Sequence, residues 1–212
     1  MRIVHVFHSY FPAKGGMENV IKALAEGTAS RGHEVHVVTG AYSGRPAEEV
    51  VNGVRVHRVR SLRLGFPDLT YPLCVPRGLL RSADVVHGHS QNSLFTVKVL
   101  GEAKGLGART AIHFMAVDSL RDHPNPLVRL LGPLYSDRNV RAALRASDLR
   151  LVKSYRDMEV LRTRYGVETV YVPDGVNEGL LAMLSTAVKE KAFELKAVIV
   201  EPGRSEAVPG AR

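Results

Sequence analysis

Residues 1–18 read MRIVHVFHSYFPAKGGME, an apolar run that leads to paired glycines and a carboxylate. The nearly continuous apolar stretch predicts a buried parallel strand, because a strand covered on both faces need not alternate. Gly15 and Gly16 follow in a loop, and a helix is predicted to begin near Met17. The unpaired N–H groups of its first turn, with the positive end of its dipole, would face that loop. An anion is the ligand that such a helix start favours.

The glycine loop also has a purely structural interpretation. A strand, a glycine loop and a helix open many Rossmann-like domains, and adjacent glycines lack the G-x-G-x-x-G spacing of a dinucleotide site. A tight turn that needs glycine dihedral angles would explain Gly15 and Gly16 equally well. Glu18 decides little, because a carboxylate in a first helical turn is favourable without any function. The loop alone leaves both interpretations open.

Composition places the chain among globular proteins. Its 212 residues are 45% hydrophobic and 24% charged, enough for one sizeable domain or one domain with an appendage. Cys74 is the single cysteine, which excludes an intramolecular disulfide and a cysteine-based metal cluster and suits a reducing compartment. The start has no signal-like pattern, and no apolar run approaches the roughly 18 residues of a membrane span. These features predict a cytoplasmic protein.

The formal net charge of +8 predicts attraction to an anionic partner. Much of the charge is local, because residues 121–164 hold ten Arg or Lys against five Asp or Glu. Arg138, Arg141 and Arg145 share a face of a predicted helix, which could be an ordinary solvated face or a surface for an anion or a membrane. Aromatic residues that could stack on bases do not interleave with these charges, so we expect no nucleic-acid partner.

Strand and helix patterns alternate along the chain. Asn52-Gly53 between two valine-rich runs predicts a hairpin near a sheet edge. Pro133 is expected to kink or divide a helix over 127–145, and Ser90 is a candidate cap for a helix that contains Leu94. The fold class predicted is α/β, a Rossmann-like three-layer domain with a mostly parallel sheet. Further strands are predicted at 35–38, 83–87, 109–113, 149–153 and 169–172, and further helices at 17–31, 77–82 and 155–164.

Ligands of such sheets bind beyond the carboxyl ends of the strands. The chemistry is therefore expected in the loops that begin at His8, His87, His113, Ser154 and Pro173. Three of these five loops begin with histidine.

Seven segments together resemble glycosyltransferase family 4. They occur in the family's order and span residues 1–179: MRIVHVFHSYFPAKGGME, RGHEVHVVT, NGVRVHRV, ADVVHGHS, GLGARTAIHF, ASDLRLVKS and YVPDGVNEG. The resemblance implies the N-terminal, acceptor-side half of the two-domain GT-B fold. It also implies an enzyme that transfers a sugar, with retention of configuration, from a nucleotide-sugar donor to a lipid, polyol or glycan acceptor.

The resemblance assigns roles to particular residues. Gly15 and Gly16 match the paired-glycine loop that approaches the donor diphosphate and the acceptor, with Glu18 beside them. His113 matches a strand-end histidine that contacts the donor sugar, although a histidine bonded only to backbone would occupy the same place. Because no Asp-x-Asp motif is present and a helix start with basic side chains can neutralise a diphosphate, neither a metal nor another cofactor is expected to be required.

The remaining histidines are given lesser roles. We expect His87 and His89 to point to opposite faces of their strand and so to make a poor two-ligand metal site. His87 is expected to lie within the sheet, whereas His89 and Ser90 are expected to emerge at the acceptor side of the cleft. His8 is also expected to leave its strand toward the cleft, although an ordinary loop histidine would fit the sequence equally well. The other histidines are expected to be solvated or packing residues, namely His5, His33, His36, His57 and His123.

The domain boundary is predicted near residue 179, with residues 180–212 as a helix and short strand. That tail would be a truncated start of the donor domain or a segment packed back on the sheet. A fragment, a truncated product or one chain of a split enzyme with a separate donor-domain chain would each show this pattern. Without a donor domain the chain is expected to be inactive, because the family's second domain supplies contacts to the diphosphate and the sugar.

Two other functions compete with glycosyl transfer. One is a noncatalytic module that binds a nucleotide or an anionic lipid. The other is a dinucleotide-dependent oxidoreductase, which Thr39 and Gly40 disfavour because they stand where a ribose-binding carboxylate is expected. Leucines beside the three arginines resemble an interfacial helix and predict weak peripheral contact with the inner membrane face, although core packing could equally explain them.

Overall fold

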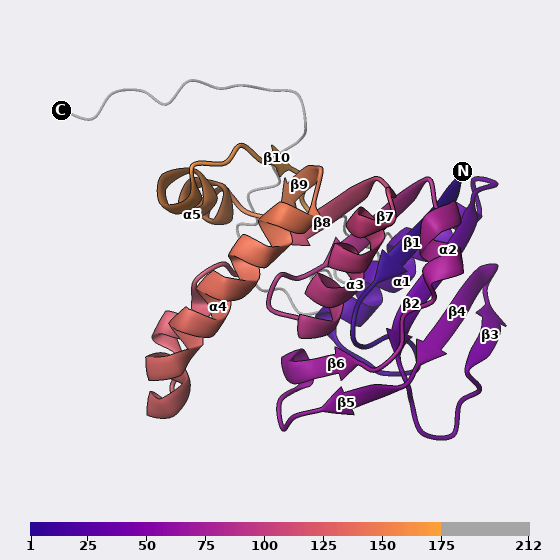
Figure 1. Cartoon of the computed structure of the whole chain (residues 1–212), viewed down its shortest axis with the longest axis horizontal. Helices are drawn as coiled ribbons and strands as arrows, with labels where there is room; N and C mark the ends of the chain where they lie inside the picture. Colours follow the sequence, from indigo (N-terminus) through magenta and orange to yellow (C-terminus); the bar gives the residue numbers. More distant parts are fainter. Residues whose placement is uncertain (175–212) are drawn as a thin grey trace, which may run out of the picture. The chain divides into compact units, whose positions relative to one another are not determined.

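The computed structural model describes residues 1–174, whose helices surround a large sheet (Figure 1). The predicted helix and strand within 180–212 lie outside the described residues. The eight strands of the sheet have the order β10-β9-β8-β7-β1-β2-β4-β3. In chain order they are β1 (Arg2–Val6), β2 (Glu34–Gly40), β3 (Glu48–Val51), β4 (Val54–Val59), β7 (Val85–His89), β8 (Thr110–Phe114), β9 (Leu149–Val152) and β10 (Val170–Tyr171).

All neighbouring strands of this sheet are parallel except β3 and β4. The predicted hairpin is confirmed, because Asn52 and Gly53 both have positive φ and join β3 to β4 at the sheet edge. Positive φ at both turn residues matches the right-handed twist of the flanking strands. The short strands β5 (Ser61–Arg63) and β6 (Thr70–Pro72) pair with each other in a separate sheet.

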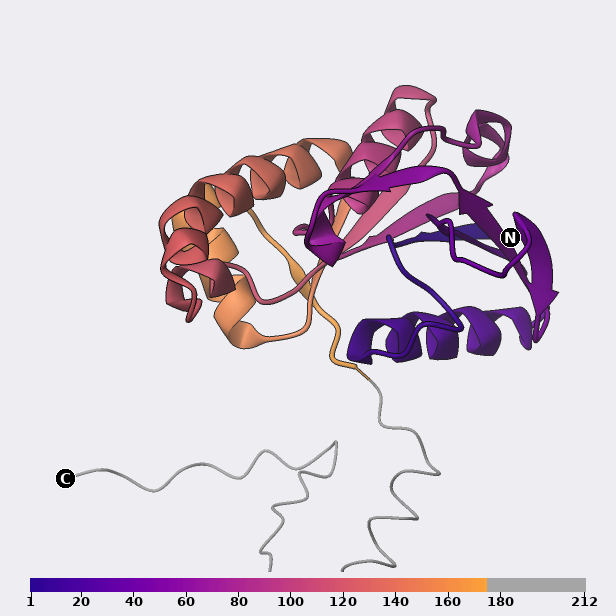
Figure 2. The same ribbon diagram turned by 90° about the horizontal axis from the view of Figure 1, so that it is seen from below.

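Helices cover both faces of the sheet, as the alternating pattern predicted (Figure 2). They are α1 (Gly16–Ala29), α2 (Arg77–Ser82), α3 (Leu94–Gly105), α4 (Pro126–Ala146) and α5 (Tyr155–Tyr165), with the short 3-10 helices η1 (Pro67–Leu69) and η2 (Ser119–Asp122). On one face, Ile21 and Ala25 of α1 pack on Val35 and Val37 of β2. On the other, α3 and α4 pack on β1, β7 and β8. The expected α/β three-layer class is therefore correct.

Two details of the helices differ from the predictions. Pro133 lies inside α4, which runs without interruption from 126 to 146, so the proline does not divide it. Ser93, not Ser90, caps α3, because its hydroxyl accepts a hydrogen bond from the backbone N–H of Thr96. Ser90 instead has a φ of 65° and follows directly after β7. The strand thus continues two residues beyond its predicted end at His87.

Within residues 1–174, no helix combines the length and the apolar character that crossing a membrane requires.

Candidate functional site

The candidate site lies at the carboxyl edge of the sheet, where β9, β8, β7 and β1 end side by side. His8 follows β1, Ser90 follows β7 and Lys153 follows β9. His113 is next to last in β8 and pairs in register with His89 of β7. The loops that follow these strands therefore meet at one edge, as expected of a parallel sheet.

Gly15 is the N-cap of α1 and Gly16 is its first residue. Gly15 has a φ of −176°, an extended conformation that any residue adopts, so the turn does not require glycine dihedral angles. A side chain at Gly15 would instead overlap the carboxylate of Glu18, whereas a Cβ at Gly16 would meet nothing. Glu18 thus lies over the start of α1, at the position that an anion would favour. A phosphate at this helix start would require Glu18 to turn away.

A surface pocket lies beside the glycine loop and carries two lysines. Its lining residues are Phe11, Pro12, Ala13, Lys14, Glu18, Asn19 and Lys22. Lys22 is paired with Glu26 at 2.9 Å on the next turn of α1. The pocket therefore places Lys14 and the start of α1 around one hollow, which an anionic group could enter only if the Glu18 carboxylate turned away.

His113 is almost completely buried at the end of β8, with 3% of its surface exposed. Its Nε2 lies 3.2 Å from the carbonyl oxygen of Val172, and a carbonyl can only accept, so Nε2 carries the proton. Burial, and then the positive charge of Lys153, lower the pKa of His113, so the ring is neutral near pH 7. Nδ1 has a free lone pair and no hydrogen-bond partner among the described residues. This ring can accept a hydrogen bond from a hydroxyl but has no second proton to donate.

Lys153 is a charged member of the site that the sequence reasoning missed. Its ammonium lies 2.6 Å from the carboxylate of Asp174 and 3.6 Å from the sulfur of Met17 at the start of α1. The sequence contained a signal for Lys153, because it directly follows an apolar strand and residues at the carboxyl ends of parallel strands line the edge where ligands bind. Lys153 therefore supplies a cation between the start of α1 and His113.

His8 leaves the end of β1 but is buried, not open to the cleft. Its Nδ1 lies 3.0 Å from the hydroxyl of Ser93 and 3.9 Å from the carboxylate of Asp68. Burial lowers the pKa of His8 to about 4, an effect that Glu18 opposes and Arg63 supports. His8 is consequently a neutral side chain that joins β1 to the start of α3.

The expectations for His87 and His89 were wrong in geometry. Residues two apart on a strand point to the same face, and their ring centroids lie 4.3 Å apart. His89 does not emerge from the sheet, because its side chain has no exposed surface and its Nε2 lies 3.1 Å from Nδ1 of His5. Ser90 is also buried, and its backbone N–H donates to the carbonyl of His113. His87 lies within the sheet as expected, and although the residue is partly exposed, its Nε2 is buried.

The three arginines Arg138, Arg141 and Arg145 are exposed on α4, away from the strand ends. The first half of α4 lies nearer the candidate site, because the Tyr135 hydroxyl donates to the carbonyl of Asn92 in the loop after β7. Leucines of that half are exposed: Leu127 by 67%, Leu130 by 73%, Leu131 by 56% and Leu134 by 74%. Core packing therefore does not explain these leucines.

The model of Glycosyltransferase Family 4 matches residues 14–179 of the chain. The chain belongs to glycosyltransferase family 4. This membership confirms the resemblance drawn from the seven sequence segments.

Curated relatives of this family member come from distant organisms. An uncharacterised glycosyltransferase of Methanocaldococcus jannaschii is 44% identical over 88% of the chain and 43% of its own length. A phosphatidylinositol N-acetylglucosaminyltransferase subunit of Arabidopsis thaliana is 25% identical over 94% of the chain and 44% of its own length. A GDP-mannose-dependent alpha-mannosyltransferase of Mycolicibacterium smegmatis is 40% identical over 41% of the chain and 25% of its own length. The chain thus spans less than half the length of each of these relatives.

Among solved structures, a sucrose-phosphate synthase of Thermosynechococcus elongatus superimposes with a TM-score of 0.50 at 16% identity. The superposition covers 91% of the present chain and 99% of the chain in the solved structure. At this identity the likeness concerns the fold alone, and it agrees with a GT-B type of Rossmann-like half.

Proposed function

We propose that this domain is the acceptor-side half of a retaining glycosyltransferase whose acceptor is carried by an anionic membrane surface. The donor would be a nucleotide sugar, and the domain would contact the inner membrane face through α4. The observation that carries the proposal is the exposed row of leucines and arginines on that helix. Family membership supplies the class of reaction.

The row forms one stripe because its members recur every three or four residues of the helix. We call it the α4 stripe; it consists of Leu127, Leu130, Leu131, Leu134, Arg138, Arg141 and Arg145. The opposite side of α4 packs into the protein through Gly132, Ser136, Asn139, Val140, Ala143 and Ala146. The four exposed leucines thus form an apolar patch of a kind that often marks an interaction surface, and the three arginines follow them along the same side of the helix.

Charge makes an anionic lipid surface the occupant that fits the α4 stripe. Within the described residues Arg138 and Arg145 make no ion pair, and Arg141 is paired with Asp137 at 2.9 Å in an exposed position where such pairs are weak. Each basic residue near an anionic surface contributes about 1 kcal/mol, and the leucines add burial in the headgroup region. The expected association is weak, reversible and sensitive to salt.

The names of two relatives support the proposed substrate classes. The Arabidopsis relative carries phosphatidylinositol, an anionic lipid, in its name and is one subunit of its enzyme. The Mycolicibacterium relative is named for dependence on GDP-mannose, a nucleotide sugar. By analogy, a separate chain that completes the donor site would be a fitting partner for this domain.

At the strand ends, we assign the diphosphate to the region of Gly15, Gly16 and Lys153. The helix start and the ammonium would stabilise the negative charge that develops on the leaving diphosphate, so that no metal is required for the transfer. His113 would accept a hydrogen bond from a sugar hydroxyl through Nδ1. Because the ring lies buried, the sugar would have to approach along the end of β8.

Vesicle cosedimentation of the 212-residue chain tests the membrane proposal. We expect binding to vesicles of phosphatidylglycerol mixed with phosphatidylcholine, little binding to phosphatidylcholine alone, and loss of binding as salt is raised. Changing the three arginines of the α4 stripe to Gln should weaken binding by about a hundredfold, since each contributes about 1 kcal/mol.

The matched control changes Arg31, Arg81 and Arg156 to Gln. This variant alters net charge by the same amount at exposed sites outside the stripe, and it should bind nearly as well as the original chain. Equal binding to both kinds of vesicle, no binding at low salt, or an equal loss in the control would reject the α4 stripe as a membrane surface. A soluble glycan or polyol would then be the better acceptor.

A further inference from the structure

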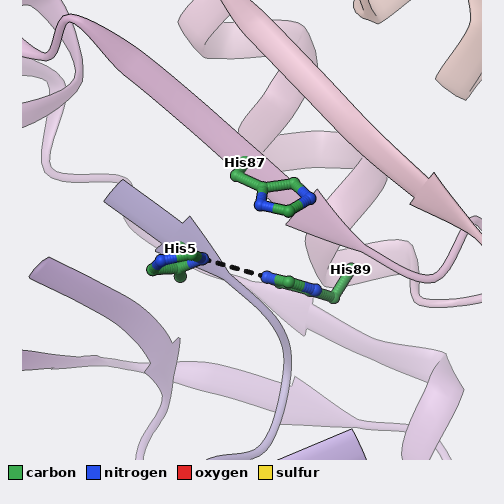
Figure 3. Close-up of side chains that lie close together, drawn as sticks. All are labelled: His5, His87 and His89. Atoms are coloured by element: carbon green, nitrogen blue, oxygen red, sulfur yellow. Dashed lines mark hydrogen bonds between the residues drawn. The ribbon is translucent and has the colours of Figure 1, made fainter. Parts of the chain in front are cut away.

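Three histidines from two neighbouring strands gather on one face of the sheet (Figure 3). They are His5 of β1 with His87 and His89 of β7, and each offers a ring nitrogen within 4.8 Å of the other two. Nδ1 of His5 and Nε2 of His89 lie 3.1 Å apart. The cluster lies against this face of the sheet, and none of its three residues lines the surface pocket beside the glycine loop.

Strand register produces this cluster. His5 pairs directly with His87 across the parallel ladder of β1 and β7, and His89 follows two residues later on the same face. Gly88, between them, points to the opposite face, where a Cβ would overlap Leu100 of α3. With α3 packed against Gly88, His87 and His89 occupy the opposite face of the sheet, the face on which His5 of β1 lies.

The three rings have the protonation state that a metal ion needs. Burial lowers the pKa of all three, and neighbouring histidines lower the pKa of His87 and His89 further, so the imidazoles are neutral. Within the described residues, one nitrogen of each ring is buried without a hydrogen-bond partner: Nε2 of His5, Nε2 of His87 and Nδ1 of His89. An ion bound at Nε2 of His87 would give that buried nitrogen the partner it lacks.

We propose that His5, His87 and His89 bind a transition metal ion of the kind that prefers imidazole, such as Zn²⁺. In a tetrahedral zinc site with Zn–N distances of about 2.0–2.1 Å, two ligand nitrogens lie about 3.3 Å apart. Nδ1 of His5 and Nε2 of His89 are 3.1 Å apart, which is close to that distance. The ion would lie between those two nitrogens, the proton now between them would move to the other nitrogen of its own ring, and rotation of the His87 ring would bring in the third ligand. Mg²⁺ and Ca²⁺ prefer oxygen ligands, which this set lacks.

The surroundings set limits on the site. The His113 ring lies next to the cluster, with its centroid 6.0 Å from that of His87. The ammonium of Lys153 opposes a cation here, although the carboxylate of Asp174 at 2.6 Å offsets its charge. His87 is the only partly exposed member of the three, although its Nε2 is buried.

The test uses the full chain without an affinity tag, stripped with chelator and then dialysed or refolded with Zn²⁺. After removal of free metal we expect one Zn²⁺ per chain by elemental analysis and a raised melting temperature, with no such effect from Mg²⁺. Co²⁺ in place of Zn²⁺ should give the strong visible bands of a four-coordinate nitrogen site. Absence of retained zinc and of these bands in the unaltered chain would overturn the proposal.

Variants locate the ion. His87→Gln, at the partly exposed member, should abolish zinc retention. The control His57→Gln removes a ring from the other close histidine pair, where His36 Nδ1 and His57 Nε2 lie 2.8 Å apart near Glu34 and Glu48, and it should retain zinc. Zinc lost only in the control would place the ion at that other pair and contradict the proposal. If His87→Gln does not fold, the Co²⁺ spectrum of the unaltered chain still decides.

Discussion

Burial decides what the histidines of this protein can do. At the strand ends, His8 and His113 are enclosed and neutral, so each acts through hydrogen bonds and not as a surface charge. Nε2 of His113 donates to the carbonyl of Val172, a bond that a purely structural histidine would also make. Nδ1 keeps a lone pair that could accept a hydrogen bond from a substrate. Only a functional measurement separates the two roles.

Replacing His113 by Ala should lower turnover by about ten- to a thousandfold, the usual loss for one active-site hydrogen-bonding group. The measurement requires a complete transferase, such as this chain fused to the second half of the Methanocaldococcus relative, assayed with a panel of nucleotide sugars. Loss of the bond to Val172 should also reduce the free energy of unfolding by about 1 kcal/mol. A variant that melts much earlier while keeping normal specific activity would show that His113 is purely structural.

At the scale of elements, close packing between β7 and α3 depends on glycine. A Cβ on Gly88 would overlap the side chains of Thr96 and Leu100, both fully buried in α3. Protein interiors are packed too tightly to absorb such an overlap without moving a strand or a helix. Gly101, on α3 itself, has open space around its Cβ position.

Substitution by alanine is therefore expected to change the free energy of unfolding in opposite directions at Gly88 and Gly101. Gly88→Ala should destabilise the fold by about 1–3 kcal/mol through overpacking. Gly101→Ala should stabilise it by about 0.5–1 kcal/mol, because alanine is the better helix former. Urea unfolding of both variants beside the original chain measures the difference, and a neutral Gly88→Ala would mean that α3 moves freely on the sheet.

At the scale of the whole molecule, buried neutral histidines couple stability to pH. The pKa of His8 is about 4 in the folded chain and about 6.5 in an unfolded one, so below pH 6.5 the unfolded state binds a proton that the folded state does not. Stability is therefore full above pH 6.5 and falls as pH drops toward 4. Burial lowers the pKa of His36 as well, which adds an effect of the same sign.

Between pH 6.5 and pH 4, His8 alone should remove up to about 1.4 kcal/mol of unfolding free energy per pH unit. His8→Gln, which can keep a hydrogen bond to Ser93, should flatten this slope when urea unfolding is followed from pH 7 to pH 5. The facing charges that could modify the effect are Glu18, Arg63 and Asp68. A His33→Gln control removes a less buried histidine, and an equal flattening there would contradict the role of His8.

Local signals in the sequence determined the elements of this protein and their order. The apolar run after Met1 predicted β1, Asn52-Gly53 predicted the edge hairpin, and seven ordered segments indicated glycosyltransferase family 4. Each of these signals lies within a short stretch of neighbouring residues and can therefore be read from the sequence. Tertiary structure alone decided which strands lie side by side and in what register. That register aligned His5 with His87, buried His89, and left the leucines of α4 exposed. These outcomes depend on residues far apart in the chain, and local propensity carries no information about such contacts.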